Sequence, residues 1–508
     1  MRILFYNWAQ FDDYKLRGGG VSVYLDGIIS KLIEDHEVFF ISSGQHYDFI
    51  SSDPRIEKTE NKYGHRVQSY RIINSPIKAP AHDAFCSLDE ARSSEKMYSL
   101  FYSFMKKHNF DVFQINNLEG LTMDIFDLKK KLPHTKFLFV AHNYHLICPQ
   151  IELFKNRKEI CYDNRCGWDC SDCLGYRPDM YELLRYQRIG SFIERIGLEG
   201  KRLGNFIFDS VIEFQRISDA SHRLGNHFSR LLTGDSISTR QSPEERRVKR
   251  GKEKAKIPCV DSNVNPSASY YFWRLDNVKT CNDNIDTVVA VSSQVKQVLT
   301  DYGVDEKKVK VLLNGTDCYH TLEQAKNIWN SKKNSRVTVA FFGYPIPSKG
   351  LDLLLDALLK INLSLVDFDF LVASHTTDEQ KKKIDILRKK FHSISVVEGY
   401  RRQDVPSLMS SVTLGVIPSL WLETYCQTAA ELIAYGSPVI ISDTVGIKDL
   451  YLDSKFIFKS GSVESLIEVL YNTLSDLENL DSFWDSIIMP MSVEEYVTKL
   501  VDIYGEII

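Results

Sequence analysis

Short apolar runs alternate with amphipathic runs along most of the chain. The first apolar run, residues 3–7, leads through a loop ending in Gly18-Gly19-Gly20 into an amphipathic run, 21–32, and then into a second apolar run, 38–41. This order predicts a strand, a helix and another strand. Further apolar strands are predicted at 112–115, 137–140 and 287–291. Continuous apolar strands are typical of a parallel sheet that helices cover on both faces.

A second series of the same kind follows the polar stretch 327–336, which we interpret as an interdomain linker. Its strands are predicted at 337–343, 368–373, 394–397, 413–417, 439–442 and 456–458, with helices such as 351–359 and 428–435 between them. Two doubly wound α/β domains in tandem, with a cleft between the carboxyl ends of their strands, are the simplest architecture that fits. We place the first domain at 1–325, the second at 335–490, and at 491–508 a C-terminal helix that can cross back to the first.

Residues from about 150 to 285 break this rhythm and form an insertion in the first domain. The insertion begins with a cysteine-rich stretch, continues with helical patterns and ends in a basic segment, 240–256, that carries eight Lys or Arg against three Glu. Few apolar residues anchor this segment, which favours a solvated loop. The alternative is that this segment binds anionic lipid or a lipid-linked phosphate electrostatically.

Composition limits the classes of protein that remain. A length of 508 residues suits two or more domains, and 43% hydrophobic residues supply large cores. The net charge of −4 gives no global basic field, so we expect no nucleic-acid partner. The apolar run at the start is too short for a signal-peptide core, and no stretch reaches the roughly 18 apolar residues that cross a bilayer. We expect a cytoplasmic protein with reduced thiols, and at most peripheral contact with the inner face of the cell membrane.

Two glutamates, Glu423 and Glu431, stand eight residues apart in the most informative stretch, 418–431. On one helix they would be about 12 Å apart, so they suit an extended ligand better than a single atom. If the helix starts near Tyr425, Glu423 lies in the loop before it and Glu431 projects from its side. The free N–H groups of the first helical turn form an anion site suited to a sugar diphosphate. Taken alone, the pair is also compatible with two ordinary solvated helix carboxylates.

The surroundings of these glutamates resemble the signature of glycosyltransferase family 4, retaining nucleotide-sugar enzymes of the GT-B fold. The stretch has a proline-serine pair, the two glutamates and then Gly436-Ser437-Pro438. Four other segments resemble that family in the same order along the chain: the glycines 18–20, Ala141-His142-Asn143, residues 311–317 and residues 343–350. Together they extend the resemblance over most of the chain outside the insertion.

The resemblance implies roles for the matching residues. Glu431 is expected to hold the ribose hydroxyls of the donor, and Glu423 the donor sugar. Lys349 is expected to neutralise the leaving diphosphate, which the glycine loop lets the backbone approach closely, while His142 faces the sugar. The catalytic set is therefore Glu423, His142 and Lys349. The donor-binding set is Gly19, Gly20, Gly343, Lys349, Glu423, Thr424, Tyr425, Cys426, Gln427 and Glu431.

The chain departs from the family pattern in two places. Many members have an arginine where this chain has Tyr344, so one phosphate-binding charge is missing. Arg401 or Arg402 is a candidate replacement. The second departure is Asn143, where an aspartate is common, and it changes the hydrogen bonding expected around His142.

Five cysteines crowd into the start of the insertion: Cys148, then Cys161, Cys166, Cys170 and Cys173. The last four can make a tetrahedral zinc site, because Cys170 and Cys173 have the spacing of half a zinc knuckle and Cys161 and Cys166 can supply the other half. Alternatively, they are small buried hydrophobic residues or reduced thiols around a loop. Any zinc would be structural, since GT-B transfer generally uses no catalytic metal.

We therefore predict a retaining glycosyltransferase. It would move a sugar from a nucleotide-diphosphate sugar to a glycan or lipid-linked glycan acceptor, in the synthesis of a bacterial surface polysaccharide such as a capsule, O-antigen or exopolysaccharide. The alternative from another class is a non-catalytic GT-B-like binding or scaffold subunit of a glycan-synthesis complex. An epimerase or phosphorylase on the same fold is a third option. Retention of Glu423, Glu431, Lys349 and His142 argues against loss of catalysis.

Overall fold

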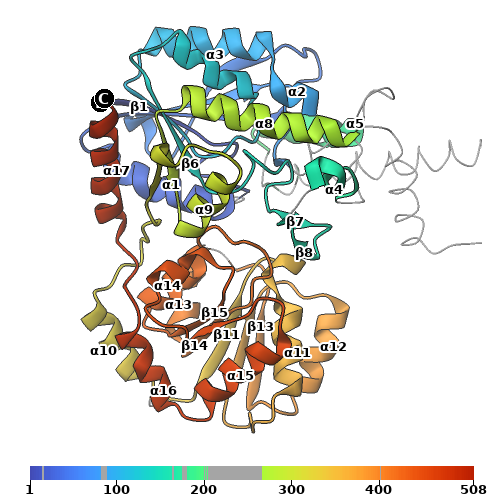
Figure 1. The fold of residues 1–508 in the computed structure, drawn as a ribbon, viewed down its shortest axis with the longest axis vertical. Helices are drawn as coiled ribbons and strands as arrows, with labels where there is room; N and C mark the ends of the chain where they lie inside the picture. Colours follow the sequence, from blue (N-terminus) through green and yellow to red (C-terminus); the bar gives the residue numbers. More distant parts are fainter. Residues whose placement is uncertain are drawn as a thin grey trace, which may run out of the picture.

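The structure, a computed structural model, has two lobes that each contain one large β-sheet (Figure 1). It describes residues 1–13, 17–81, 88–162, 165–173, 180–198, 201, 203, 266–333, 335–400 and 402–508. The basic segment 240–256 therefore lies outside the described residues. The predicted α/β class, with two doubly wound sheets in tandem, is confirmed.

The first lobe contains an eight-stranded sheet in the order β10-β9-β6-β5-β1-β2-β4-β3. Its strands are β1 (Arg2–Tyr6), β2 (Glu37–His46), β3 (Arg55–Thr59), β4 (Val67–Ile73), β5 (Val112–Ile115), β6 (Lys136–Ala141), β9 (Thr287–Ala290) and β10 (Val309–Val311). All neighbours pair in parallel except β3 and β4. The helices around it include α1 (Gly19–Leu32), α3 (Glu95–His108), α8 (Pro266–Asn284) and α9 (Ser293–Asp301). Every residue of β5 and β9 is buried, as expected for strands covered on both faces.

The second lobe contains a six-stranded parallel sheet in the order β13-β12-β11-β14-β15-β16. Its strands are β11 (Thr338–Phe342), β12 (Asp369–Ala373), β13 (Ser393–Val397), β14 (Leu414–Ile417), β15 (Val439–Ser442) and β16 (Ile457–Phe458). The helices include α11 (Leu351–Lys360), α12 (Asp378–Leu387), α13 (Val405–Ser410), α14 (Gln427–Ala434) and α15 (Val463–Leu474). The strand order reverses between β11 and β14. In doubly wound sheets, ligands bind in the crevice outside the strand ends at such a point.

Two segments differ in secondary structure from the sequence-based interpretation. Most of the expected linker 327–336 belongs to helix α10 (Leu322–Lys332), which begins with a capping box between Thr321 and Gln324. Burial of Trp329 holds this polar helix in place. The second correction concerns Gly19 and Gly20, which form the start of α1 rather than the end of a loop.

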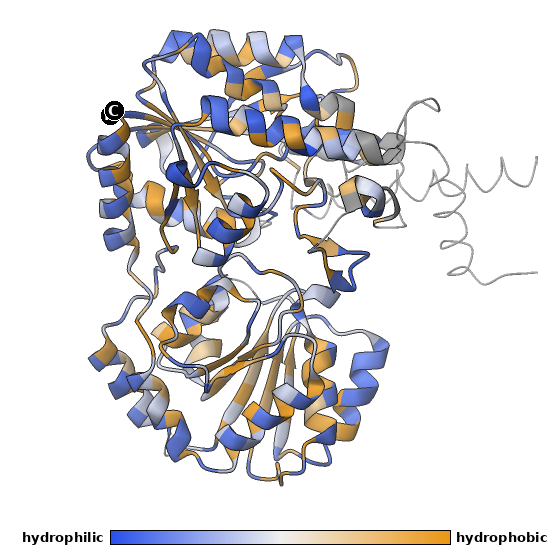
Figure 2. Cartoon of the chain, in the orientation of Figure 1, coloured by the Kyte–Doolittle hydropathy of each residue, from blue (hydrophilic) through white to orange (hydrophobic). Residues whose placement is uncertain are grey.

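The C-terminal helix α17 (Val493–Ile507) returns to the first lobe and runs alongside it (Figure 1). It packs on α1, and the hydroxyls of Tyr24 and Tyr496 lie 2.8 Å apart. In Figure 2 the strands of both sheets are largely hydrophobic, whereas polar residues gather on the outward faces of the helices. Within the residues that the structure describes, no helix combines the length and apolar character needed to cross a membrane.

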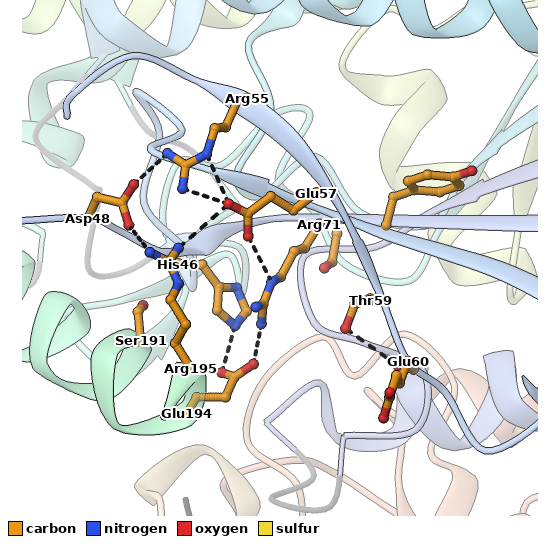
Figure 3. Close-up of polar contacts among 12 residues, drawn as sticks. His46, Asp48, Arg55, Glu57, Thr59, Glu60, Arg71, Ser191, Glu194 and Arg195 are labelled. Carbon is orange, nitrogen blue, oxygen red and sulfur yellow. Dashed lines mark hydrogen bonds and ion pairs between the residues drawn. The ribbon is translucent and has the colours of Figure 1, made fainter. Parts of the chain in front are cut away.

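A network of charged side chains fastens helix α5 (Met180–Arg195) to the edge of the first sheet (Figure 3). The Glu194 carboxylate pairs with Arg71 and lies 3.0 Å from Nε2 of His46. Arg195 pairs with Asp48 at 2.8 Å. Ion pairs therefore connect the end of α5 to β4 and to the end of β2 and the residues after it.

Candidate functional site

A cavity of about 470 Å³ lies between the two lobes at the carboxyl ends of their central strands. His142 follows β6, Gly343 follows β11 and Pro418 follows β14, and all three line this cavity. Because the carboxyl ends of parallel strands meet at one edge, residues distant in sequence are brought together here.

The cavity gathers every donor-site residue that the sequence predicts. From the first lobe come Gly19, Gly20 and His142, and from the second come Gly343, Lys349, Glu423, Thr424, Tyr425, Cys426, Gln427 and Glu431. This placement shows their proximity. The role of each residue stays a prediction.

Lys349 and Glu423 line the cavity and form an ion pair in which Glu423 is buried and Lys349 is partly buried. Glu423 also accepts a hydrogen bond from the Ser419 hydroxyl, and the Lys349 ammonium lies 5.5 Å from the centre of the Trp421 ring. Burial alone would lower the pKa of Lys349, but the neighbouring acidic groups, chiefly Glu423, together outweigh burial and the pKa rises. Lys349 is therefore a fixed positive charge facing the cavity.

Glu431 projects from the side of α14 and pairs with Arg402. Burial raises the pKa of the Glu431 carboxyl, and the Arg402 guanidinium opposes that rise. Arg402 also lies 3.6 Å from Asp317 of the first lobe. The Arg402 guanidinium therefore holds Glu431 in position at one end of the cavity.

His142 presents a neutral imidazole to the cavity. Burial lowers its pKa to about 3, so the ring carries no charge at neutral pH. Its ring packs edge-on against Tyr24, with the centroids 4.5 Å apart. Its Nε2 is buried and has no hydrogen-bond partner among the described residues.

Other buried polar atoms around the same cavity lack partners in the described part of the chain. These atoms belong to Asn314, Trp421, Tyr425 and Gln427, and the Nε2 of His142 is a fifth. Buried polar groups are nearly always hydrogen-bonded in folded proteins. Their concentration in one cavity indicates a site for a polar ligand.

Helix α14 begins at the cavity floor. Its N-cap, Cys426, has a left-handed backbone with φ of 88°, and its side chain makes no capping hydrogen bond. Free N–H groups at the first turn therefore remain available to an anion. Glu423 lies in the loop before this helix, as predicted, although the helix starts two residues later than expected.

Tyr344 and Asn143, the two residues that depart from the family pattern, lie in different surroundings. Tyr344 lines the cavity and is 57% exposed, so no cation stands at that position. Arg402 lines the cavity, whereas Arg401 lies outside the described residues. Asn143 donates to Asn117 at 2.7 Å and to Glu119 at 3.1 Å. Asn143 therefore belongs to a buried polar network of the first lobe.

The cysteines predicted to bind zinc do not come together as one set. Cys170 and Cys173 are buried and Cys161 is partly buried, but Cys166 is exposed. Cys166 sits in a short turn with φ of 53°, which carries its side chain to the surface. Among the described residues, no three His, Cys, Asp or Glu side chains already stand at the spacing that holds a metal ion.

Sequence reasoning missed two side chains and one contact that hold the site together. Ser419 fixes Glu423, Trp421 lies beside Lys349, and the Thr424 hydroxyl donates to the His142 carbonyl at 2.9 Å. Ser419 had a signal, because it stands four residues before Glu423 in the signature. The contact between Thr424 and His142 had none, since 282 residues separate them.

Comparison with known proteins finds a family similar to the second domain. Residues 336–476 match the family model "Glycosyl transferases group 1". No curated protein matches the chain.

Solved structures show the fold of the whole chain. It resembles sucrose-phosphate synthase from Thermosynechococcus elongatus (TM-score 0.54, 12% identity, 100% of this chain and 98% of that one). It also resembles Anabaena HepE in complex with UDP (TM-score 0.52, 11% identity, 100% of both chains) and the lipopolysaccharide outer core galactosyltransferase WaaB (TM-score 0.52, 12% identity, 100% of both chains). At these identities the likeness shows the GT-B fold.

Proposed function

We propose that this chain, which carries a group 1 glycosyltransferase domain on a GT-B fold, transfers a sugar from a nucleotide-diphosphate sugar to a glycan acceptor and retains the anomeric configuration. The observation that carries this proposal is the interlobe cavity, where unpartnered buried polar atoms surround a fixed cation and a free helix N-terminus. This combination suits a ligand with an anionic diphosphate and many hydroxyl groups.

In the proposed arrangement the diphosphate lies between Lys349 and the first turn of α14. The negative charge on the leaving phosphate grows as the anomeric bond lengthens, and pre-positioned positive charge stabilises it. Glu431, held by Arg402, accepts hydrogen bonds from the ribose hydroxyls. Glu423 accepts hydrogen bonds from the donor sugar. The donor would thus extend along the 418–431 stretch, with its two ends on the two glutamates.

His142 orients the sugar rather than donating a proton to the leaving group. Its low pKa, caused by burial, keeps the imidazole neutral, so it is a poor general acid at neutral pH. Its unpartnered Nε2 can bind one sugar hydroxyl. We assign charge stabilisation to Lys349 and the helix N-terminus, and no catalytic metal is included in this scheme.

Two of the similar structures support finer parts of the proposal. The Anabaena HepE structure contains UDP, which supports a nucleotide-diphosphate donor. WaaB is a lipopolysaccharide galactosyltransferase, which supports a role in bacterial surface polysaccharide synthesis. We place the acceptor on the first lobe, and a lipid-linked acceptor would bring the enzyme to the inner face of the membrane.

The test is a panel of UDP-, GDP-, ADP- and dTDP-sugars, measured first by thermal shift. A ligand at about 100 times its dissociation constant stabilises the fold by about 2.7 kcal/mol. The stabilising donor is then incubated without acceptor, with and without EDTA, and release of nucleoside diphosphate is followed. NMR of a transfer product reads the anomeric configuration.

We expect slow donor hydrolysis that Glu423→Gln abolishes and EDTA leaves unchanged. Donor binding without turnover, in the presence of acceptor glycans, would instead support the scaffold alternative. A product with inverted anomeric configuration would contradict the retaining mechanism, and a requirement for added magnesium would contradict the metal-independent scheme.

A further inference from the structure

Four cysteines of the first lobe line one small cavity of about 20 Å³. They are Cys148, in the loop after β6, Cys161, after β8 (Glu159–Ile160), and Cys170 and Cys173, in and after α4 (Trp168–Asp172). A cavity of this size holds a single water-sized body. Cys166 is exposed and is not among the lining residues. The structure therefore groups Cys148, rather than Cys166, with the other three.

Two groups around this cavity donate hydrogen bonds to cysteine sulfur. The buried guanidinium of Arg274 donates to Cys170 Sγ at 3.4 Å and, through Nε, to the Ile147 carbonyl at 2.6 Å. The backbone N–H of Asn156 donates to Cys173 Sγ at 3.5 Å. Donors of this kind stabilise negative sulfur and orient metal-bound thiolates. A nearby cation also offsets the charge of several thiolates in a buried place.

We propose that Cys148, Cys161, Cys170 and Cys173 bind one zinc ion as a tetrahedral thiolate site. Four sulfur ligands favour zinc over magnesium or calcium, which prefer oxygen. Each thiol gives up its proton to solvent as its bond to zinc forms. In this structure the sulfurs stand further apart than a zinc site requires, so binding must draw the loop segments together. Such coupling of metal binding to local folding is usual in structural zinc sites.

This site would fasten the loop that leaves the candidate active site. The loop between His142 and Cys148 is tied by hydrogen bonds from Tyr144 N to Ile151 O at 3.0 Å and from Cys148 N to Tyr144 O at 2.7 Å. In Figure 1, the hairpin of β7 (Phe154–Lys155) and β8 extends from this loop toward the second lobe. Zinc would join the end of this loop, at Cys148, to the segment after the hairpin, at Cys161, and to α4 and the residue after it. This role is structural, and it does not depend on which sugar or acceptor the enzyme uses.

The experiment compares Cys148→Ser with Cys166→Ser in the full chain, purified under reducing conditions and without affinity metals. Elemental analysis of the wild type should give about one zinc per chain. Cys166→Ser should keep that zinc, and Cys148→Ser should lose most of it. Loss of zinc from Cys166→Ser with retention in Cys148→Ser would overturn the ligand set. Wild-type protein without zinc after incubation with ZnSO4 would overturn the site.

A second measurement covers the case in which Cys148→Ser fails to fold. Wild-type protein is alkylated with iodoacetamide before and after treatment with a chelator, and mass spectrometry locates the label. We expect Cys166 to be labelled in both samples and the four ligand cysteines to be labelled only after chelation. Disulfides among those four in the reduced preparation, or equal labelling with and without chelator, would overturn the proposal.

Discussion

The hydroxyl of Thr424, in the second lobe, donates a hydrogen bond of 2.9 Å to the backbone carbonyl of His142, in the first. The carbonyl of Thr424 in turn accepts from the Ser292 hydroxyl at 2.7 Å. One residue of the 418–431 stretch therefore bridges the lobes twice. Because Thr424 directly follows Glu423, these contacts between the lobes also constrain the position of the Glu423 carboxylate.

Replacing Thr424 with valine should loosen these contacts between the lobes. Valine keeps the shape but removes the donor, and a hydrogen bond of this kind contributes about 1 kcal/mol net. We expect kcat/KM to fall about fivefold and small-angle scattering to show a larger radius of gyration. Thr424→Ser keeps the hydroxyl and is the control. A valine variant with wild-type scattering and activity would show that the bond does not hold the cleft closed.

Lys349→Met should reduce kcat about 10²- to 10³-fold, the usual effect of removing a group that stabilises transition-state charge. The measurement is release of nucleoside diphosphate at saturating donor. Lys360→Met, an exposed lysine at the end of the helix that follows Lys349, should leave kcat unchanged. A fall in thermal stability is also expected, because Glu423 would lose its partner in a buried place. Equal turnover in the two variants would remove Lys349 from the mechanism.

Glu431→Ala should raise the donor KM more than it lowers kcat. A contact to ribose hydroxyls is the same in the ground and transition states, so its loss weakens binding without slowing the chemical step. Loss of hydrogen bonds to a carboxylate corresponds to about a tenfold or larger rise in KM. Arg402→Met keeps the Glu431 carboxylate but removes the guanidinium that pairs with it, so it should give a smaller rise in the donor KM. An unchanged KM in Glu431→Ala would exclude Glu431 from the nucleotide site.

The ion pairs that hold α5 predict a pH dependence. Burial alone would raise the pKa of Glu194, but the hydrogen bond with His46 and the charge of Arg71 outweigh burial and lower it to about 2. A carboxyl with a lowered folded-state pKa stabilises the protein above its unfolded-state pKa, near 4.3, and loses that contribution as the pH falls toward 2. Allowing for its partial exposure, we expect about 2 kcal/mol at pH 7.

Glu194→Gln should therefore lower the urea midpoint at pH 7, and its difference from wild type should shrink between pH 5 and pH 3. Glu37→Gln is the control, because Glu37 pairs with Arg2 at 3.0 Å but is 61% exposed. Exposed pairs contribute little, so its midpoint should stay near that of wild type. A Glu194 effect that is constant over this pH range would contradict the assignment of the acid sensitivity to its carboxylate.

The sheets could be predicted from the sequence because their strands are continuous apolar runs. β14 and β15 are buried at every position, and a segment of that composition has few alternatives. Helix α10 was missed because most of its surface is polar, and only Ala325 and Trp329 are buried. Its capping box was the available signal. The hydrophobic pattern of the sequence therefore predicts the buried strands well and a largely polar surface helix such as α10 poorly.

The candidate site could be predicted as a set of residues but not as a geometry. The resemblance supplied Lys349, Glu423 and Glu431, and the structure places them around one cavity. Arg402 was named only as one of two candidates for the missing phosphate-binding charge, and its pairing with Glu431 was not predicted, because the direction of a loop side chain does not follow from its position in the sequence. The cysteines show the same limit, since sequence spacing favoured Cys166 and the fold turns that residue outward.

The turn at Gly350 gives a test that is independent of substrate. Gly350 has φ of +74°, and a Cβ there would lie 1.8 Å from the Pro418 carbonyl oxygen. Gly461 has nearly the same backbone, with φ of +76°, but no described atom lies within 4 Å of its Cβ position. Alanine at Gly461 should therefore report the cost of a left-handed backbone alone, about 1 kcal/mol.

Alanine at Gly350 should cost clearly more than that, because the turn between Lys349 and α11 must also move away from the strand end at Pro418. The measurement is thermal unfolding of both variants beside wild type, with a larger fall in midpoint for Gly350→Ala. The same displacement shifts the lysine that pairs with Glu423, so donor binding should weaken in Gly350→Ala and stay unchanged in Gly461→Ala. Equal destabilisation in the two variants would show that the close contact with Pro418 does not constrain this turn.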